Sequence, residues 1–183
     1  MTQALLIIDI QNDYFPGGRM ELVGSPQAAA QAARLVAAFR AKRAPVVHVQ
    51  HVSLRPGATF FLPDTEGARI HESVAPLADE TVIVKHFPNA FRETPLLERL
   101  RSGGVDKLVI AGMMTHMCID TTTRAAADLG FECVLAHDAC ATRDLSFGGA
   151  KVAARDVHYA FVAALNGAFA KAIGADEIAA AGL

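Results

Sequence analysis

The 183-residue chain is long enough for one α/β domain with its own core, and its 52% hydrophobic content excludes an intrinsically disordered chain. Its 17 basic and 19 acidic residues leave a net charge of −2, which argues against a protein that binds nucleic acid through a basic face. The sequence shows neither a signal-peptide pattern nor a bilayer-length apolar run, so we expect a cytoplasmic protein that does not bind membranes.

Five short apolar runs are candidates for the strands of a parallel sheet. Runs that are continuously apolar, without polar alternation, are typical of strands buried on both faces. They cover Ala4–Ile8, Pro45–Val52, Thr81–Val84, Lys107–Ala111 and Glu132–Ala136.

Four further segments have helical patterns and alternate with these runs. They are Pro26–Lys42, Thr94–Arg101, Ile119–Leu129 and Gly149–Ile173. The alternation predicts a single domain over residues 1–183, with a three-layer α-β-α architecture and a doubly wound, mainly parallel sheet of Rossmann-like type. The chain contains no glycine-rich phosphate-binding motif, so we expect no nucleotide cofactor.

Three chemically reactive side chains are expected at one edge of this sheet. Asp9 ends the first strand, Lys85 ends the third, and Cys118 follows the fourth strand just before a helix. Each could be merely structural on its own, as a turn residue, a solvated charge or a small apolar residue. Ligands of open α/β sheets, however, bind beyond the carboxyl ends of the strands, where these three groups would meet.

A thiol, a carboxylate and an amine in one place suit nucleophilic catalysis. The thiolate is the attacking form of cysteine, and both a helix N-terminus and a nearby ammonium favour it. We therefore expect Cys118 to be a nucleophile whose thiolate Lys85 favours. Asp9 would accept the thiol proton and return it to the departing amine.

Four segments along nearly the whole chain resemble the isochorismatase-like cysteine hydrolases, a superfamily that includes nicotinamidases, N-carbamoylsarcosine amidase and ureidoacrylate-type amidohydrolases. These segments are LLIIDIQNDYF, VIVKHFPNAFRETPL, LVIAGMMTHMCIDTTTRAAADLGF and VLAHDACAT. The resemblance implies cofactor-independent hydrolysis of a small amide- or ureido-type C–N bond through a cysteine thioester. In it, Asp9 is base and acid, Lys85 the electrostatic partner and Cys118 the nucleophile.

The resemblance also implies features around the nucleophile and between subunits. It places a cis peptide bond at Met113–Met114 and an oxyanion hole at the backbone amides of Met114 and Cys118. It implies a homodimer or homotetramer, and the apolar character of the expected helix Gly149–Ile173 also favours an oligomer.

The sequence departs from the resemblance at the metal site. Nicotinamidases carry an Asp-x-His motif after the second strand, where this chain has His51 and Ser53. His48 and His51 stand three residues apart, and on a strand they would point to opposite faces. We therefore expect no bound metal and consider nicotinamide an unfavourable substrate.

Residues close to the strand ends are candidates for contact with a small-molecule substrate. We assign this role to Gln11, Phe15, Phe91 and His116. The long loop Val52–Pro76 could cover a pocket, but the sequence does not settle the roles of its Arg55 and Phe60, nor that of Cys140.

Two other functions remain open. An isochorismatase-type hydrolase would cleave a vinyl ether through Asp9 and would not need Cys118. A non-catalytic α/β protein could instead use Cys118 to bind a ligand or to sense oxidants. The three cysteines, an odd and sparse set, do not indicate a disulfide framework.

Overall fold

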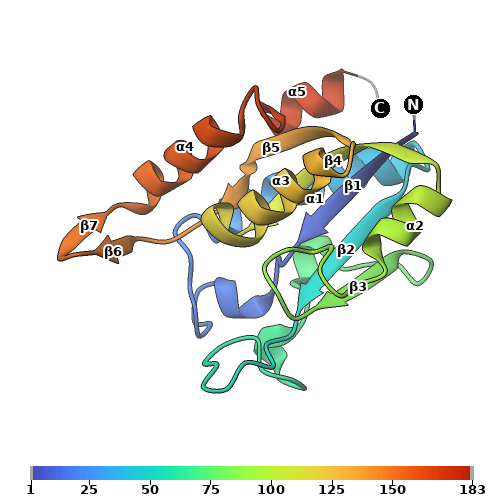
Figure 1. Cartoon of the computed structure of the whole chain (residues 1–183). Helices are drawn as coiled ribbons and strands as arrows, with labels where there is room; N and C mark the ends of the chain where they lie inside the picture. Colours follow the sequence, from blue (N-terminus) through green and yellow to red (C-terminus); the bar gives the residue numbers. More distant parts are fainter. Residues whose placement is uncertain (1, 182–183) are drawn as a thin grey trace.

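The computed structural model describes residues 2–181, and these contain a six-stranded parallel sheet with helices on both faces (Figure 1). The strand order is β3-β2-β1-β4-β5-β8. The strands are β1 (Thr2–Ile8), β2 (Val46–His51), β3 (Thr81–Lys85), β4 (Val105–Met113), β5 (Glu132–Ala141) and β8 (Lys171–Ile173).

The chain reverses its direction of winding between β1 and β4. It builds β2 and β3 outward on one side of β1, and it then returns to build β4, β5 and β8 on the other side. The carboxyl ends of neighbouring strands diverge at such a switch point, which leaves room for a ligand. This topology confirms the predicted doubly wound α/β fold and locates the expected site above β1 and β4.

The helices form one layer on each face of the sheet. One layer consists of α1 (Ser25–Ala41) and α5 (Ala175–Ala180), and the other of α2 (Leu96–Ser102), α3 (Asp120–Asp128) and α4 (Ala154–Leu165). The alternation along β1 divides the core accordingly, because successive side chains of a strand point to opposite faces. Leu5 and Ile7 pack towards α1, whereas Leu6 and Ile8 pack with residues of α2 and α3.

Short turns complete the path of the chain. The 3-10 turns are η1 (Asn12–Tyr14), η2 (Glu66–Ala68) and η3 (Glu72–Val74), and a π-helical turn, η4 (Thr115–Ile119), connects β4 to α3.

The five predicted strands are confirmed, but the bounds of the predicted helix Gly149–Ile173 are wrong, because only its central part is helical. This segment forms the end of a hairpin, then α4, then β8. The hairpin joins β6 (Leu145–Phe147) to β7 (Ala150–Val152), and its turn residues Gly148 and Gly149 have φ of 57° and 82°. Two positive φ values are what a two-residue type I′ hairpin turn requires, and glycine adopts them without strain. α4 ends before Gly167, whose φ is 86°.

The hairpin extends away from the sheet, beyond the N-terminal end of α4 (Figure 1). Phe147 at its tip is 92% exposed, and Tyr159 on α4 is 60% exposed. The expected homo-oligomer stays a prediction.

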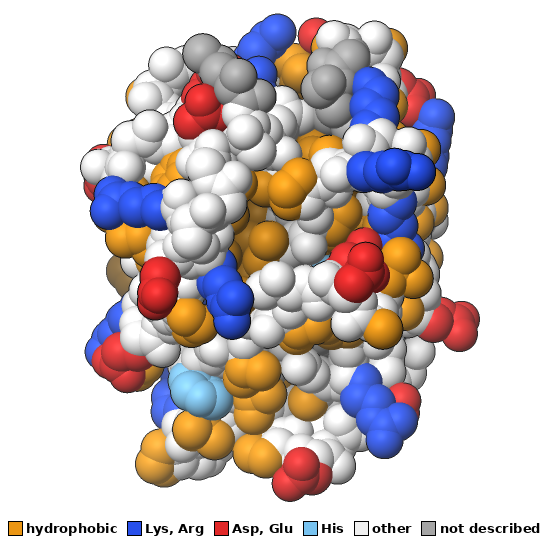
Figure 2. Space-filling model, turned by 90° about the vertical axis from the view of Figure 1, so that its right-hand side faces the viewer, with side chains coloured by type: hydrophobic (Ala, Val, Ile, Leu, Met, Phe, Trp, Pro, Cys, Tyr) orange, Lys and Arg blue, Asp and Glu red, His pale blue; other side chains and the backbone are white. Residues whose placement is uncertain are grey.

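The surface carries charges of both signs. Figure 2 shows basic and acidic side chains scattered over one face, with hydrophobic side chains between them. None of the helices within residues 2–181 combines the length and apolar character that a membrane span requires.

Candidate active site

Asp9, Lys85 and Cys118 meet at the carboxyl edge of the sheet, as predicted. Lys85 Nζ lies 2.8 Å from Asp9 Oδ2 and 3.3 Å from Cys118 Sγ, to which it can donate a hydrogen bond. The side chains of Asp9 and Lys85 are fully buried, and Cys118 is 5% exposed. An ion pair and a thiol therefore share a site from which bulk water is largely excluded.

Close backbone packing between β1 and β4 brings these groups together. Gly112, near the end of β4, has a φ of 138°, and a Cβ atom built there would lie 1.9 Å from the carbonyl oxygen of Ile8. Only glycine fits such an approach. Asp9 directly after β1 also has a positive φ, 54°, and its N–H donates to the carbonyl of Val49 on β2.

Cys118 lies in the π-helical turn η4 before the first residue of α3. The N–H of Ile119 donates to the carbonyl of Met114 at 3.3 Å, five residues back, which defines this wider turn. The peptide bond between Met113 and Met114 is cis, at the position that the resemblance implies.

The surroundings of Cys118 shift the pKa of its thiol in opposite directions. Burial raises the pKa of the Cys118 thiol, and the negative charge of Asp9 raises it further, while Lys85 lowers it. Burial opposes the charge of Lys85, but Asp9 and Cys118 outweigh that effect and raise the pKa of Lys85. The site therefore rests as a thiol beside an ammonium: Lys85 favours the thiolate, as expected, but it does not outweigh burial and Asp9.

His51, the last residue of β2, is a fourth member of the site that the sequence pattern did not reveal. Its Nδ1 atom lies 2.9 Å from Lys85 Nζ. An ammonium group has no acceptor, so Nδ1 accepts this hydrogen bond and Nε2 carries the ring proton. Burial, followed by the charge of Lys85, lowers the pKa of His51 to about 4, which keeps the ring neutral at pH 7. The register of the parallel strands explains this contact, because His51 on β2 is paired with Lys85 on β3.

The donor set of this site does not fit a metal ion. One ligand atom each from Asp9, His51 and Cys118 lies within 4.8 Å of the others, a spacing that a metal could use. The Lys85 ammonium already contacts all three side chains, at 2.8, 2.9 and 3.3 Å. A metal bound between them would be placed against a buried positive charge, which is electrostatically unfavourable.

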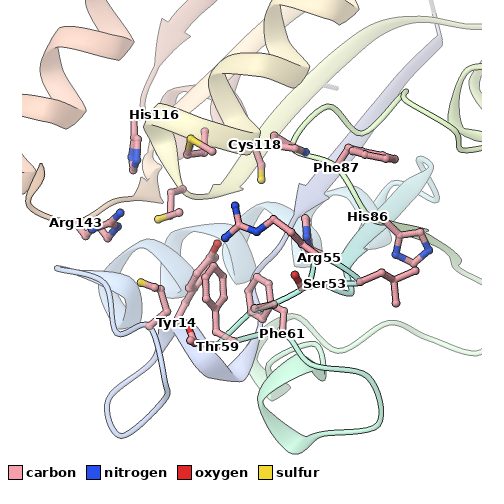
Figure 3. A pocket seen from close by; sticks show the side chains of 18 of the residues that line it. Tyr14, Ser53, Arg55, Thr59, Phe61, His86, Phe87, His116, Cys118 and Arg143 are labelled. Carbon is pink, nitrogen blue, oxygen red and sulfur yellow. The ribbon is translucent and has the colours of Figure 1, made fainter.

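A pocket of about 740 Å³ opens onto Cys118 and His51 (Figure 3). The loop after β2 supplies much of its wall, from Ser53 to Phe61, so the long loop does cover a pocket. The wall is mainly apolar, and its charged members are Arg55, Glu93 and Arg143. The other lining side chains include Tyr14, Met20, Thr59, Phe60, His86, Phe87, Met114, His116 and Met117.

Of the four side chains assigned to substrate contact, only His116 lines this pocket, where it hydrogen-bonds Thr142 Oγ1. Phe15 stacks on His71 with ring centroids 3.6 Å apart, and Phe91 packs on Phe131. Phe15 is a buried core residue, and the partly buried Phe91 packs against the other core cluster. Cys140 is buried beside the carbonyl of Ala136.

Gln11, which we also assigned to substrate contact, does not line this pocket and instead hydrogen-bonds the backbone. Its Nε2 donates to the carbonyls of His51 and Ala68, and its Oε1 accepts the His51 N–H at 2.7 Å. Its neighbour Asp13 accepts the Phe61 N–H through Oδ2 at 2.7 Å. Both residues therefore fix the backbone of the loop that forms the pocket wall.

Comparisons with known proteins show which family this chain resembles. A family model described as Isochorismatase domain matches residues 3–177. YddQ of Bacillus subtilis (strain 168), an uncharacterised isochorismatase family protein, is 55% identical over 170 residues, or 93% of this chain and 94% of that protein. Maleamate amidohydrolase of Pseudomonas putida is 32% identical over 155 residues, or 76% of this chain and 72% of that protein. The crystal structure of a protein described as an isochorismatase hydrolase from Oleispira antarctica has a TM-score of 0.94 at 53% identity, covering 98% of this chain and 96% of that one.

Proposed function

The chain belongs to the isochorismatase family, and we propose that it hydrolyses a small amide-type C–N bond with Cys118 as the nucleophile. The observation that carries this proposal is the contact of Lys85 with both Asp9 and Cys118 at the floor of a pocket. A relative that is named an amidohydrolase supports C–N chemistry.

The first half-reaction forms a thioester. Cys118 rests as a thiol, so its proton passes to Asp9 as the sulfur attacks the substrate carbonyl carbon. The carbonyl oxygen becomes an oxyanion, which the backbone amides of Met114 and Cys118 would stabilise as the resemblance implies. The C–N bond then breaks, and the amine or ammonia leaves with the proton from Asp9.

The second half-reaction releases the acid. Asp9 takes a proton from a water molecule, which attacks the thioester carbonyl, and the C–S bond breaks. The proton on Asp9 returns to the sulfur and restores the thiol. Throughout the cycle the Lys85 ammonium offsets the negative charge, which resides first on Asp9 and then on the sulfur during proton transfer.

The test is ammonia release from a panel of small amides, carbamoyl compounds and ureides. Cys118→Ala should abolish release while circular dichroism shows an unchanged fold. Cys133→Ala is the matched control, because it removes a buried thiol from β5 outside the pocket lining. Acid quenching during turnover should show the acyl group on Cys118 by peptide mass spectrometry. Full activity of Cys118→Ala would refute the proposal that Cys118 is the nucleophile.

A further inference from the structure

Two arginine side chains line the pocket without a partner for their charge. Arg55 comes from the loop after β2, and Arg143 follows β5 (Figure 3). Within residues 2–181, neither guanidinium has a carboxylate oxygen within 4.0 Å. Arg143 donates only to the adjacent backbone carbonyl of Asp144, at 3.5 Å.

The charge of Arg143 acts inside the pocket. It helps to lower the pKa of His116, which burial lowers most, and it opposes the burial that raises the pKa of Tyr14. Figure 3 shows the Arg55 side chain reaching into the space below Cys118 and Arg143 at the opposite wall. The two cations thus face one cavity from two sides.

The other charged groups around this cavity are already compensated. Lys85 pairs with Asp9, and the Glu93 carboxylate at the rim pairs with Arg92 at 3.5 Å. His51 and His116 have lowered pKa values and are neutral at pH 7. The uncompensated charge of the pocket is therefore positive and belongs to the two arginines.

We propose that the substrate is an amide that also carries a carboxylate, which Arg55 and Arg143 bind. This inference rests on the proposed function of Cys118. The planar guanidinium fork matches the two oxygens of a carboxylate, and such charge-assisted hydrogen bonds are stronger than neutral ones. Tyr14 and Phe61 give the same pocket an apolar wall, which suits a short hydrocarbon spacer between the carboxylate and the amide.

Two amides of nearly the same shape test this specificity. Succinamate ends in a carboxylate where butyramide ends in a methyl group, and each would release ammonia from the same primary amide. We expect a kcat/KM that is about 10- to 100-fold higher for succinamate, because hydrogen bonds to charged groups contribute this much. Arg55→Gln and Arg143→Gln should each reduce this ratio about tenfold or more. Arg101→Gln, an exposed α2 residue outside the pocket lining, should preserve it.

A second measurement reads binding without turnover. The rate at which iodoacetamide, a neutral reagent, alkylates Cys118 is followed by mass spectrometry at increasing amide concentrations. Succinamate should protect the thiol at lower concentrations than butyramide in the wild type. That difference should disappear in Arg55→Gln and persist in Arg101→Gln.

The outcomes separate the two proposals. If butyramide is hydrolysed as efficiently as succinamate, the carboxylate inference is wrong and the amide hydrolase stands. If neither amide releases ammonia, the proposed function loses its support, and protection of Cys118 still decides the inference. Equal protection by both amides, or an unchanged preference in both arginine variants, would overturn it.

Discussion

Replacement of Lys85 by methionine should destabilise the protein far more than the loss of one surface charge. Lys85 and Asp9 are both fully buried and lie 2.8 Å apart, and Asp9 has no other cationic partner within the described residues. Removing one member of a buried ion pair costs about 3–5 kcal/mol, because the remaining charge stays uncompensated. With a urea slope of about 2 kcal/mol per molar, the unfolding midpoint should fall by about 1.5–2.5 M.

The double variant Asp9→Asn, Lys85→Met separates this electrostatic cost from lost packing. It removes both charges, so its urea midpoint should lie well above that of Lys85→Met alone. Lys107→Met is the matched control: Lys107 pairs with Glu132 at 2.8 Å on the surface and should lose about 0–1 kcal/mol. A double variant that is as unstable as Lys85→Met would refute the reasoning that a stranded carboxylate causes the loss.

Three further predictions concern the site and its backbone. Asp9→Asn should lower the pH at which iodoacetamide alkylates Cys118, because the negative charge that helps to raise the thiol pKa is removed; an upward shift of the rate profile would contradict this. Because the pKa of folded His51 is about 4, below its unfolded value of about 6.5, its contribution to stability is present above pH 6.5 and is lost as the pH falls towards 4. Urea midpoints at pH 7.5 and pH 5 should therefore differ less in His51→Gln than in the wild type, and an equal or larger difference would count against this assignment. Gly112→Ala should cost about 3 kcal/mol or more, since its Cβ would collide with the Ile8 carbonyl, and a thermal midpoint equal to wild type would show that β4 can move aside.

The sequence was most informative where the backbone follows a regular period. Continuous apolar runs identified the five long strands, and the rule that ligands bind at the carboxyl ends of parallel strands then placed Asp9, Lys85 and Cys118 together. The three-residue strand β8 was missed because its sequence, Lys-Ala-Ile, lies in an Ala-rich stretch that is also compatible with helix.

Two properties of the site could not be read from the sequence. The pocket wall comes largely from a loop, whose path depends on tertiary hydrogen bonds such as that from Phe61 to Asp13 and not on any periodicity. The protonation state of Cys118 depends on how far burial and Asp9 outweigh Lys85, and burial is known only once the chain is folded.

The fixation of the pocket loop bears on how such a scaffold can change its substrate. The N–H of Ser53 donates to the carbonyl of Phe61 at 2.8 Å, and the N–H of Phe61 donates to the Asp13 carboxylate. The residues between these two points, which include Arg55, thus form a short span tethered at both ends, while Gln11 secures the neighbouring His51 separately. New side chains in this span can alter what enters the cavity while the ion pair and the sulfur beneath it keep their positions, so recognition and bond cleavage can diverge independently in this chain.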